Sequence, residues 1–269
     1  MNFRLLALDG GGIRGYMTAK IMHQLEQDAG IDLTSKDVVD GYSGTSTGGL
    51  LAIALANQHS PESLAALYKN KASEIFSPNH NRRVVWAILQ AARFVPGLRD
   101  LIEGIGIFSS QYVADGLHKV AKDLVGDATF GDFDPERVLA VNTAAMKIPG
   151  TEEGWTSTTL CNQELPRSRV GDSRLIRQLD GALSTSAAPS YFPPHKIVAN
   201  GTSMGFFADG GLFANNPVLN GMTVATAKNM ARLEDFRVIS IGTGVNDTGI
   251  PERVFVNPRD FGILEWLGL

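Results

Sequence analysis

The sequence predicts an α/β fold built around a mainly parallel sheet, and two successive segments carry this prediction. Residues 3–8 form a short apolar run, typical of a buried parallel strand, and a glycine-rich loop and an amphipathic helix from about Tyr16 follow it. A second strand near residues 38–42 leads through a tight turn into another apolar, helix-forming run. Two strand–loop–helix units in succession indicate parallel strands with right-handed crossovers. The glycine loop and the second turn should therefore lie side by side, at the carboxyl ends of their strands.

Later segments continue the alternation of helices and strands. Ser60 and Pro61 are typical N-cap and first-turn residues of a helix, and residues 110–126 form an amphipathic helical pattern that Gly126 ends. The same reasoning predicts a helix over residues 174–183 and strands at residues 138–141, 155–161, 206–208 and 237–241, the first two strands forming a hairpin.

The chain has the organisation of a single domain. It contains no repeat, linker or low-complexity tract, so we predict one domain over residues 1–269. Residues 76–108 are less regular and rich in apolar side chains; we interpret them as an inserted helical lid or acyl-pocket lining, with ordinary core packing as the alternative. The apolar ending at residues 261–269 looks like a helix cut short, and we expect further C-terminal residues to be missing.

Composition and charge argue against several function classes. Of the 269 residues, 43% are hydrophobic and 19% are charged, which suits a globular domain with a large core. A net charge of -4 offers no basic excess for nucleic acid. The single cysteine, Cys161, forbids an internal disulfide and fits a reducing compartment. No apolar run reaches about 18 residues and none resembles a signal peptide, so we expect a cytoplasmic protein that touches membranes at most peripherally.

The clearest chemical signal is the segment Gly-Thr-Ser-Thr-Gly at residues 44–48, which has the form G-x-S-x-G. In this pattern a serine sits on a sharp turn between a strand and a helix, and the flanking glycines let neighbouring backbone pass closely. The following helix directs its free N–H groups and its positive dipole end toward the serine. Ser46 is therefore a candidate nucleophile, with a plain helix N-cap as the alternative interpretation.

The glycine loop at residues 10–15 admits two interpretations. Its G-x-G-x-x-G spacing after a strand fits a dinucleotide-binding fingerprint, but that site needs an acidic residue at the end of the second strand. Asp32 comes too early for this role, and Asp40 is followed by the serine turn. The N–H groups of the loop would equally hold the oxyanion of a tetrahedral ester intermediate. We favour the oxyanion interpretation and keep a nucleotide-binding module as the alternative function.

A nucleophilic serine needs a base, and the order of residues along the chain argues against the familiar triads. All five histidines precede Asp209, the strongest acidic candidate, whereas α/β-hydrolases have the order serine, acid, histidine. The other two triad orders end in the serine, which here comes early. Asp209 ends an apolar strand and precedes two glycines, so direct pairing with Ser46 is the simpler hypothesis. A triad that contains His195, which lies beside a Pro-Pro turn, is the alternative.

Three motifs together resemble the patatin-like phospholipase family. They are Asp-Gly-Gly-Gly-Ile-Arg-Gly at residues 9–15, Gly-Thr-Ser-Thr-Gly at residues 44–48 and Asp-Gly-Gly at residues 209–211. The segments at residues 184–194 and 240–244 are similar to the family as well. The resemblance implies a three-layer α/β/α sandwich and hydrolysis of lipid esters by a Ser–Asp dyad, with no metal or other cofactor. Many members carry alanine where Gly211 stands, a departure that should not affect the carboxylate.

Carried over to this chain, the resemblance gives each site residue a role. Ser46 would be the nucleophile and Asp209 the general base. The expected oxyanion hole comprises Gly10, Gly11, Gly12, Arg14 and Thr47, with backbone N–H groups as donors and Arg14 ordering the loop or adding positive field.

The expected substrate is a lipid ester, most simply a phospholipid or lysophospholipid met transiently at a membrane or micelle surface. A free aspartate is a weak base, so we expect burial near Phe206, Phe207 and Phe213 to raise the pKa of Asp209. The sequence predicts neither the head-group preference nor the oligomeric state.

Overall fold

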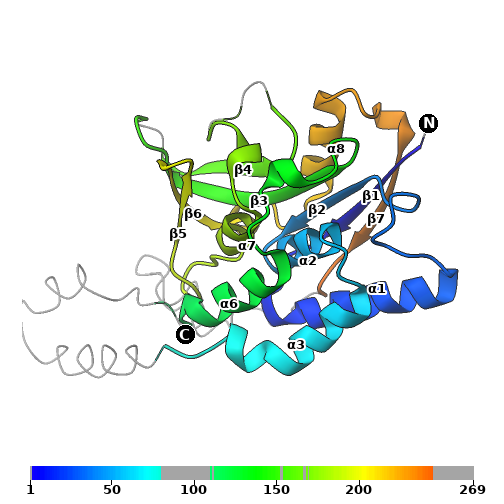
Figure 1. The fold of residues 1–269 in the computed structure, drawn as a ribbon, viewed down its shortest axis with the longest axis horizontal. Helices are drawn as coiled ribbons and strands as arrows, with labels where there is room; N and C mark the ends of the chain where they lie inside the picture. Colours follow the sequence, from blue (N-terminus) through cyan, green and yellow to red (C-terminus); the bar gives the residue numbers. More distant parts are fainter. Residues whose placement is uncertain are drawn as a thin grey trace, which may run out of the picture.

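A seven-stranded mixed sheet runs through the molecule, and helices cover both of its faces (Figure 1). The computed structural model describes residues 2–79, 110, 112–151, 154–165, 168 and 170–244. The sheet has the strand order β5 (His195–Ala199), β6 (Thr202–Asp209), β3 (Val138–Lys147), β2 (Gly41–Thr45), β1 (Phe3–Leu8) and β7 (Phe236–Ile241), and β4 (Thr156–Cys161) also pairs with β3. Strands β7, β1, β2 and β3 run parallel to one another, whereas β4 and β6 run antiparallel to β3, and β5 runs antiparallel to β6.

Strand β3 pairs with three neighbours, and this pairing decides where the other strands end. Along one edge, β3 pairs with β4. Along the other edge, the first half of β3 pairs with β2 in a parallel arrangement, which ends where Thr45 lies opposite Asn142. The second half of β3 pairs with β6 in an antiparallel arrangement, which begins at the next position, where Asp209 lies opposite Thr143. Strands β2 and β6 therefore run toward each other, and their carboxyl ends meet at adjacent positions of β3.

Most of the helices lie on one face of the sheet. Helix α2 (Thr47–Ala56) has all ten of its residues buried, and α7 (Gln178–Thr185) packs beside it against the sheet. Helices α1 (Gly15–Ala29), α3 (Pro61–Ile75) and α6 (Ala114–Val125) form an outer layer along the lower side of Figure 1, whereas α8 (Val218–Ala227) covers the opposite face. The three-layer α/β/α arrangement expected from the motifs is confirmed.

The alternation of side chains along β1 divides the core into two parts. Leu6 and Leu8 belong to the large cluster on the α2 face, whereas Phe3 and Leu5 pack with Val224 of α8 on the other face. Successive residues of a strand point to opposite faces of its sheet, so both faces of β1 are apolar. Burial of each such side chain contributes roughly 1.5–3 kcal/mol relative to exposure.

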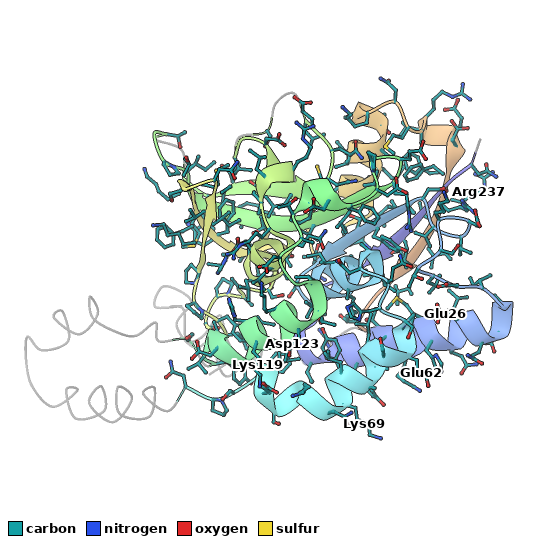
Figure 2. The ribbon with its side chains drawn as sticks, in the orientation of Figure 1. Glu26, Glu62, Lys69, Lys119, Asp123 and Arg237 are labelled. Atoms are coloured by element: carbon teal, nitrogen blue, oxygen red, sulfur yellow. The ribbon has the colours of Figure 1, made fainter. Side chains whose placement is uncertain are left out.

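Charged side chains project from the outer helices. Figure 2 shows Lys69 on α3, and Lys119 and Asp123 on α6, along the outer surface. An ion pair of 2.8 Å between Lys119 Nζ and Glu74 Oε1 joins these two helices. Within the described residues, no helix is both long and apolar enough to cross a bilayer.

The helices and strands predicted from the sequence are present in the structure, but several begin or end at other residues than expected. Strand β1 matches residues 3–8, but β2 begins three residues later than expected because its sequence, Gly-Tyr-Ser-Gly-Thr, lacks an apolar pattern and forms a strand through burial between β1 and β3. The helix expected over residues 174–183 is a short 3-10 turn followed by α7. Strand β5 and helix α8 were not predicted. Of the segment 76–108, interpreted above as a lid or pocket lining, residues 80–108 lie outside the described residues, as do residues 261–269, interpreted as a truncated helix.

Candidate active site

Ser46 occupies a strained turn between β2 and α2. Its φ of 54° and ψ of -127° place it outside the regions that non-glycine residues usually adopt. A Cβ on Gly44 would lie 2.3 Å from the carbonyl oxygen of Gly48, and one on Gly48 would lie 2.0 Å from that of Leu8. Only glycine fits at these two positions, because Gly44 packs against the first turn of α2 and Gly48 packs against the end of β1. The backbone around Ser46 thus has the form expected for an exposed nucleophile.

The end of β6 brings Asp209 to Ser46. Thr45, the last residue of β2, pairs with Asn142, and Asp209 pairs with the next residue of β3. The carboxylate of Asp209 is hydrogen-bonded to Ser46, and its Oδ1 accepts the N–H of Gly211 at 2.7 Å. The structure therefore brings together the two residues that the sequence named as nucleophile and base.

Asp209 is buried without a compensating cation. The residue is 5% exposed, and no ion pair reaches its carboxylate from the described part of the chain. Burial raises the pKa of Asp209 to about 6, because the hydrogen bonds from Ser46 and Gly211 offset only part of the cost of desolvation. Such a carboxylate is ionised near neutral pH and is a stronger base than a free aspartate. Of the three phenylalanines named above, Phe207 is fully buried, whereas Phe206 and Phe213 are 46% and 50% exposed.

The glycine loop lies directly beside Ser46. A Cβ on Gly10 would come within 3.1 Å of the Ser46 Cβ, which confirms that the two turns are neighbours. The N–H groups of Gly11, Gly12 and Thr47 have no acceptor among the described residues, and all three residues line the same cavity as Ser46. Free backbone donors around a nucleophile are what an oxyanion hole requires.

Arg14 contacts the glycine loop from its exposed side. Its guanidinium donates to the carbonyl oxygens of Gly11 at 3.5 Å and Gly244 at 3.4 Å, and its own N–H donates to Gly11. These contacts fit a residue that orders the loop. They place a positive charge at the edge of the same cavity.

A cavity of about 760 Å³ contains Ser46 and Asp209 in its wall. This volume lies within the range of small-molecule binding pockets. Much of its lining is apolar or aromatic and comes from α2, α3, α6 and the segment after α7, with Leu50, Ile75, Phe76, Leu117, Tyr191 and Phe192 among the residues involved. Near Ser46, the hydroxyl of the buried Tyr68 is hydrogen-bonded to that of Thr47. The site therefore combines a small polar centre with a large apolar space.

The histidines are placed elsewhere. His195 Nε2 lies 2.9 Å from Asp180 Oδ1, which also binds Arg177, so the histidine considered for a triad has a different carboxylate as its partner. His59 contacts the carbonyl oxygen of Leu124, and no described histidine contacts Ser46 or Asp209. The described residues also contain no cluster of three or more potential metal-ligating side chains.

Two other aspartates have local partners. Asp40 accepts both the backbone N–H and the guanidinium of Arg4, and Asp9 accepts the side chain of Asn216. A dinucleotide site would need a carboxylate at the end of β2 to bind the ribose, but Ser46 follows this strand instead. Asp40 lies before the start of the strand. This placement gives the dinucleotide interpretation no support.

The sequence missed several residues that hold the site together. Thr185 Oγ1 accepts the N–H of Ser46 at 2.8 Å and donates to the carbonyl oxygen of Asn142 at 2.6 Å. Asn215 and Thr243 bind the carbonyl oxygen of Gly10. These side chains lie within or next to segments that resembled the family, but nothing in their local sequence assigns them a partner.

Comparison with known proteins agrees with this geometry. The family model described as patatin-like phospholipase matches residues 6–221. The chain belongs to the patatin-like phospholipase family. The resemblance drawn from the three motifs is thereby confirmed, and in this chain the three motifs lie at the carboxyl ends of β1, β2 and β6.

Several curated relatives share the patatin-like region. The cGAMP-activated phospholipase of Vibrio cholerae is 33% identical over 251 residues, which cover 89% of this chain and 64% of the relative. The 85/88 kDa calcium-independent phospholipase A2 of Mus musculus is 26% identical, over 89% of this chain and 27% of its own. The chain thus spans less than two thirds of either relative. VipD from Legionella pneumophila aligns over 88% of this chain and 49% of its own with a TM-score of 0.45 and 16% identity, so the patatin-like assignment rests on the sequence matches.

Proposed function

We propose that this protein is a serine acyl hydrolase that cleaves ester bonds of lipids, most simply phospholipids or lysophospholipids, through a Ser46–Asp209 dyad. One observation carries the proposal: a buried carboxylate, with no cationic partner among the described residues, is hydrogen-bonded to a strained serine in the wall of a largely apolar cavity. The names of the Vibrio and mouse relatives support the same substrate class.

The first half of the reaction forms an acyl-enzyme. Asp209 takes the proton of the Ser46 hydroxyl as Oγ attacks the carbonyl carbon of the ester. The negative charge that develops on the carbonyl oxygen is held by the N–H groups of Gly11, Gly12 and Thr47. When the tetrahedral intermediate collapses, the bond to the leaving oxygen breaks, and Asp209 gives its proton to the departing alcohol.

The second half releases the fatty acid. Asp209 removes a proton from a water molecule, whose oxygen attacks the carbonyl carbon of the Ser46 ester. Collapse of this second intermediate breaks the bond to Ser46 Oγ, which recovers the proton from Asp209. The same donors and the same carboxylate serve both halves, so neither a histidine nor a metal is needed in this scheme.

The surroundings of the cavity support a lipid substrate. Ile13, Tyr191 and Leu212 line the cavity and are each 48% exposed, so apolar side chains continue from the cavity wall to the surface. An acyl chain could enter along such a path from a membrane or micelle with little apolar area left in water. We propose a transient lipid surface as the partner in catalysis.

Covalent labelling tests this function. A fluorophosphonate probe should form one adduct per molecule, located at Ser46 by peptide mass spectrometry, and Ser46→Ala should abolish both the adduct and hydrolysis. Ser43→Ala is a matched control, because Ser43 is a buried serine of β2 whose hydroxyl binds the carbonyl oxygen of Pro217 at 2.9 Å, away from the cavity. Since the Vibrio relative is named as cGAMP-activated, the assays are run with and without cGAMP. Absence of an adduct at Ser46 under both conditions would overturn the proposal.

A further inference from the structure

Thr243, which follows β7 near the end of the described chain, is joined to the glycine loop at the other end of the sequence. It is 4% exposed, and its Oγ1 donates a hydrogen bond of 2.7 Å to the carbonyl oxygen of Gly10. The side chain of Asn215 donates to the same oxygen at 3.4 Å, and the N–H of Gly10 donates to the carbonyl oxygen of Asn215 at 3.3 Å. The Gly10 carbonyl is therefore held by two donors from distant parts of the chain.

The position of this carbonyl fixes the direction of a neighbouring N–H group. The carbonyl of Gly10 and the N–H of Gly11 belong to one planar trans peptide unit, in which the two groups point in opposite directions. Because the Gly10 carbonyl oxygen points toward the Thr243 hydroxyl, the N–H of Gly11 must point away from Thr243. Gly11 lines the cavity that contains Ser46, and its N–H has no acceptor among the described residues.

Close packing leaves the threonine little freedom. A Cβ on Gly11 would lie 2.2 Å from Thr243 Oγ1 and 2.5 Å from its Cβ, so the side chain rests directly against the loop backbone. Threonine is branched at Cβ and has restricted rotation about χ1, which further limits the positions of its hydroxyl. The donor and the loop therefore hold each other in one arrangement.

We propose that Thr243 is a positioning residue for the oxyanion hole. Its hydroxyl orients the Gly10–Gly11 peptide so that the Gly11 N–H is aimed in advance at the oxyanion of the tetrahedral intermediate. This inference rests on the proposed hydrolase function. Removal of one oxyanion donor lowers kcat about 10²–10³-fold in other hydrolases. Loss of the Thr243 hydroxyl leaves the Gly11 N–H in place but no longer fixes its direction, so we expect a smaller fall in kcat, of about 10–100-fold.

Two substitutions at Thr243 separate the hydroxyl from packing. Thr243→Val keeps the shape and loses the donor, and we expect kcat to fall about 10–100-fold while KM changes less than about twofold. Thr243→Ser keeps the donor and loses a methyl group, and should retain kcat within about threefold. Ser43→Ala, which removes a comparable buried hydroxyl–carbonyl bond elsewhere in the same sheet, should leave kcat unchanged. Equal kcat values for Thr243→Val and wild type would overturn the proposal.

Inhibitor affinity distinguishes positioning from a general loss of structure. A trifluoromethyl ketone with a fatty acyl chain forms a tetrahedral adduct with a serine, and its affinity should fall in Thr243→Val by the same factor as kcat. A long-chain fatty alcohol, which offers no oxyanion, should bind with unchanged affinity. Equal weakening of both ligands would show a structural effect and contradict the proposal. If Thr243→Val is poorly folded by its thermal midpoint, Thr243→Ala serves for the same comparison.

The experiments distinguish failure of the Thr243 proposal from failure of the proposed hydrolase function. Failure of the fluorophosphonate to label Ser46 in the unaltered protein would remove the hydrolase function. Normal labelling and hydrolysis in the unaltered protein, with no selective loss in Thr243→Val, would remove the role of Thr243 alone.

Discussion

Asp180 and Asp209 are both almost completely buried, yet the protein surrounds them in opposite ways. Asp180 is 2% exposed and lies at the start of α7, where it binds Arg177 and His195. Asp209 is 5% exposed and lies at the end of β6, where its partners are the hydroxyl of Ser46 and one backbone N–H. The first carboxylate is bound by a guanidinium and a histidine ring, whereas the second has only neutral partners among the described residues.

The two environments change the pKa values in opposite directions. Burial alone would raise the pKa of Asp180, but hydrogen bonds from His195 and Arg177 outweigh it and hold the pKa below its ordinary value. Burial dominates at Asp209 and raises its pKa to about 6. A paired buried carboxylate joins parts of a structure, whereas an unpaired one is available for proton transfer. The comparison also places His195, which the sequence left open as the histidine of an alternative triad, beside Asp180 and not beside Asp209.

The shifts also give opposite dependences of stability on pH. The folded protein holds the proton of Asp209 more tightly than the unfolded chain does, so its contribution to stability falls as pH rises from 3.8 toward about 6. Above that range, a pKa raised by about two corresponds to a cost on the order of 3 kcal/mol. Asp180 has a lowered pKa, so its contribution is present above 3.8 and is lost as pH falls through the lowered value.

The largest expected effect is the loss of activity in Asp209→Asn. Hydrolysis should fall about 10³-fold or more, because the base is gone, while the protein becomes more stable by about 1–3 kcal/mol at pH 7 because an unpaired charge is removed from the interior. Steady-state kinetics and denaturant unfolding measure the two quantities. The gain in stability should vanish at pH 3.5, where Asp209 is protonated in both states. A less stable variant at pH 7 would contradict the contrast with Asp180.

Asp180→Asn should show the reverse pattern. The substitution removes a buried charge that is bound by the guanidinium of Arg177 and the ring of His195, so we expect a loss of about 1–3 kcal/mol in the free energy of unfolding at pH 7. Fluorophosphonate titration counts the competent sites, and hydrolysis per labelled site should stay within about threefold of the unaltered protein. A large fall in turnover per site would mean that Asp180 takes part in the chemistry.

The pH dependence of hydrolysis reports the ionisation of Asp209 directly. Because the ionised form is the base, kcat/KM should fall as the pH drops through about 6, reaching about one tenth of its plateau near pH 5. The profile is measured with a neutral ester substrate, so that substrate ionisation does not contribute. A midpoint near 4 would show that Asp209 is not the buried base described here.

The smallest expected effect on activity is that of His195→Ala. His195 is bound to Asp180 and lies apart from Ser46, so turnover should remain within about threefold. Its thermal midpoint should fall slightly, because Asp180 keeps Arg177 as a partner. Loss of most activity in folded protein would restore the histidine triad as the mechanism.

Local sequence was enough to predict the turn that carries Ser46, the proposed nucleophile, and the glycine loop beside it. The glycines around Ser46 and those before Arg14 are required by close backbone approach and turn geometry, which leave a recognisable pattern within a few residues. Asp209 could be named only by elimination, since Asp-Gly is a common turn, and the resemblance to the family gave the choice its weight. The apolar strand β1 and helix α3 were found because hydrophobic spacing and a cap determine them locally.

What the tertiary structure decided is how these parts meet. The head-to-head approach of β2 and β6 on β3 follows from strand pairing, and no local pattern encodes the register of residues that lie far apart in the chain, such as Thr45 opposite Asn142 and Asp209 opposite Thr143. Thr185, Asn215 and Thr243 lie 139, 205 and 233 positions from the backbone groups they bind, and such common polar residues show their role only when the fold supplies the partner. The sequence by itself determined the chemical groups and the turns that expose them. Packing determined that Asp180 is paired with Arg177 and His195, whereas Asp209 is buried with only the hydroxyl of Ser46 and a backbone N–H as described partners.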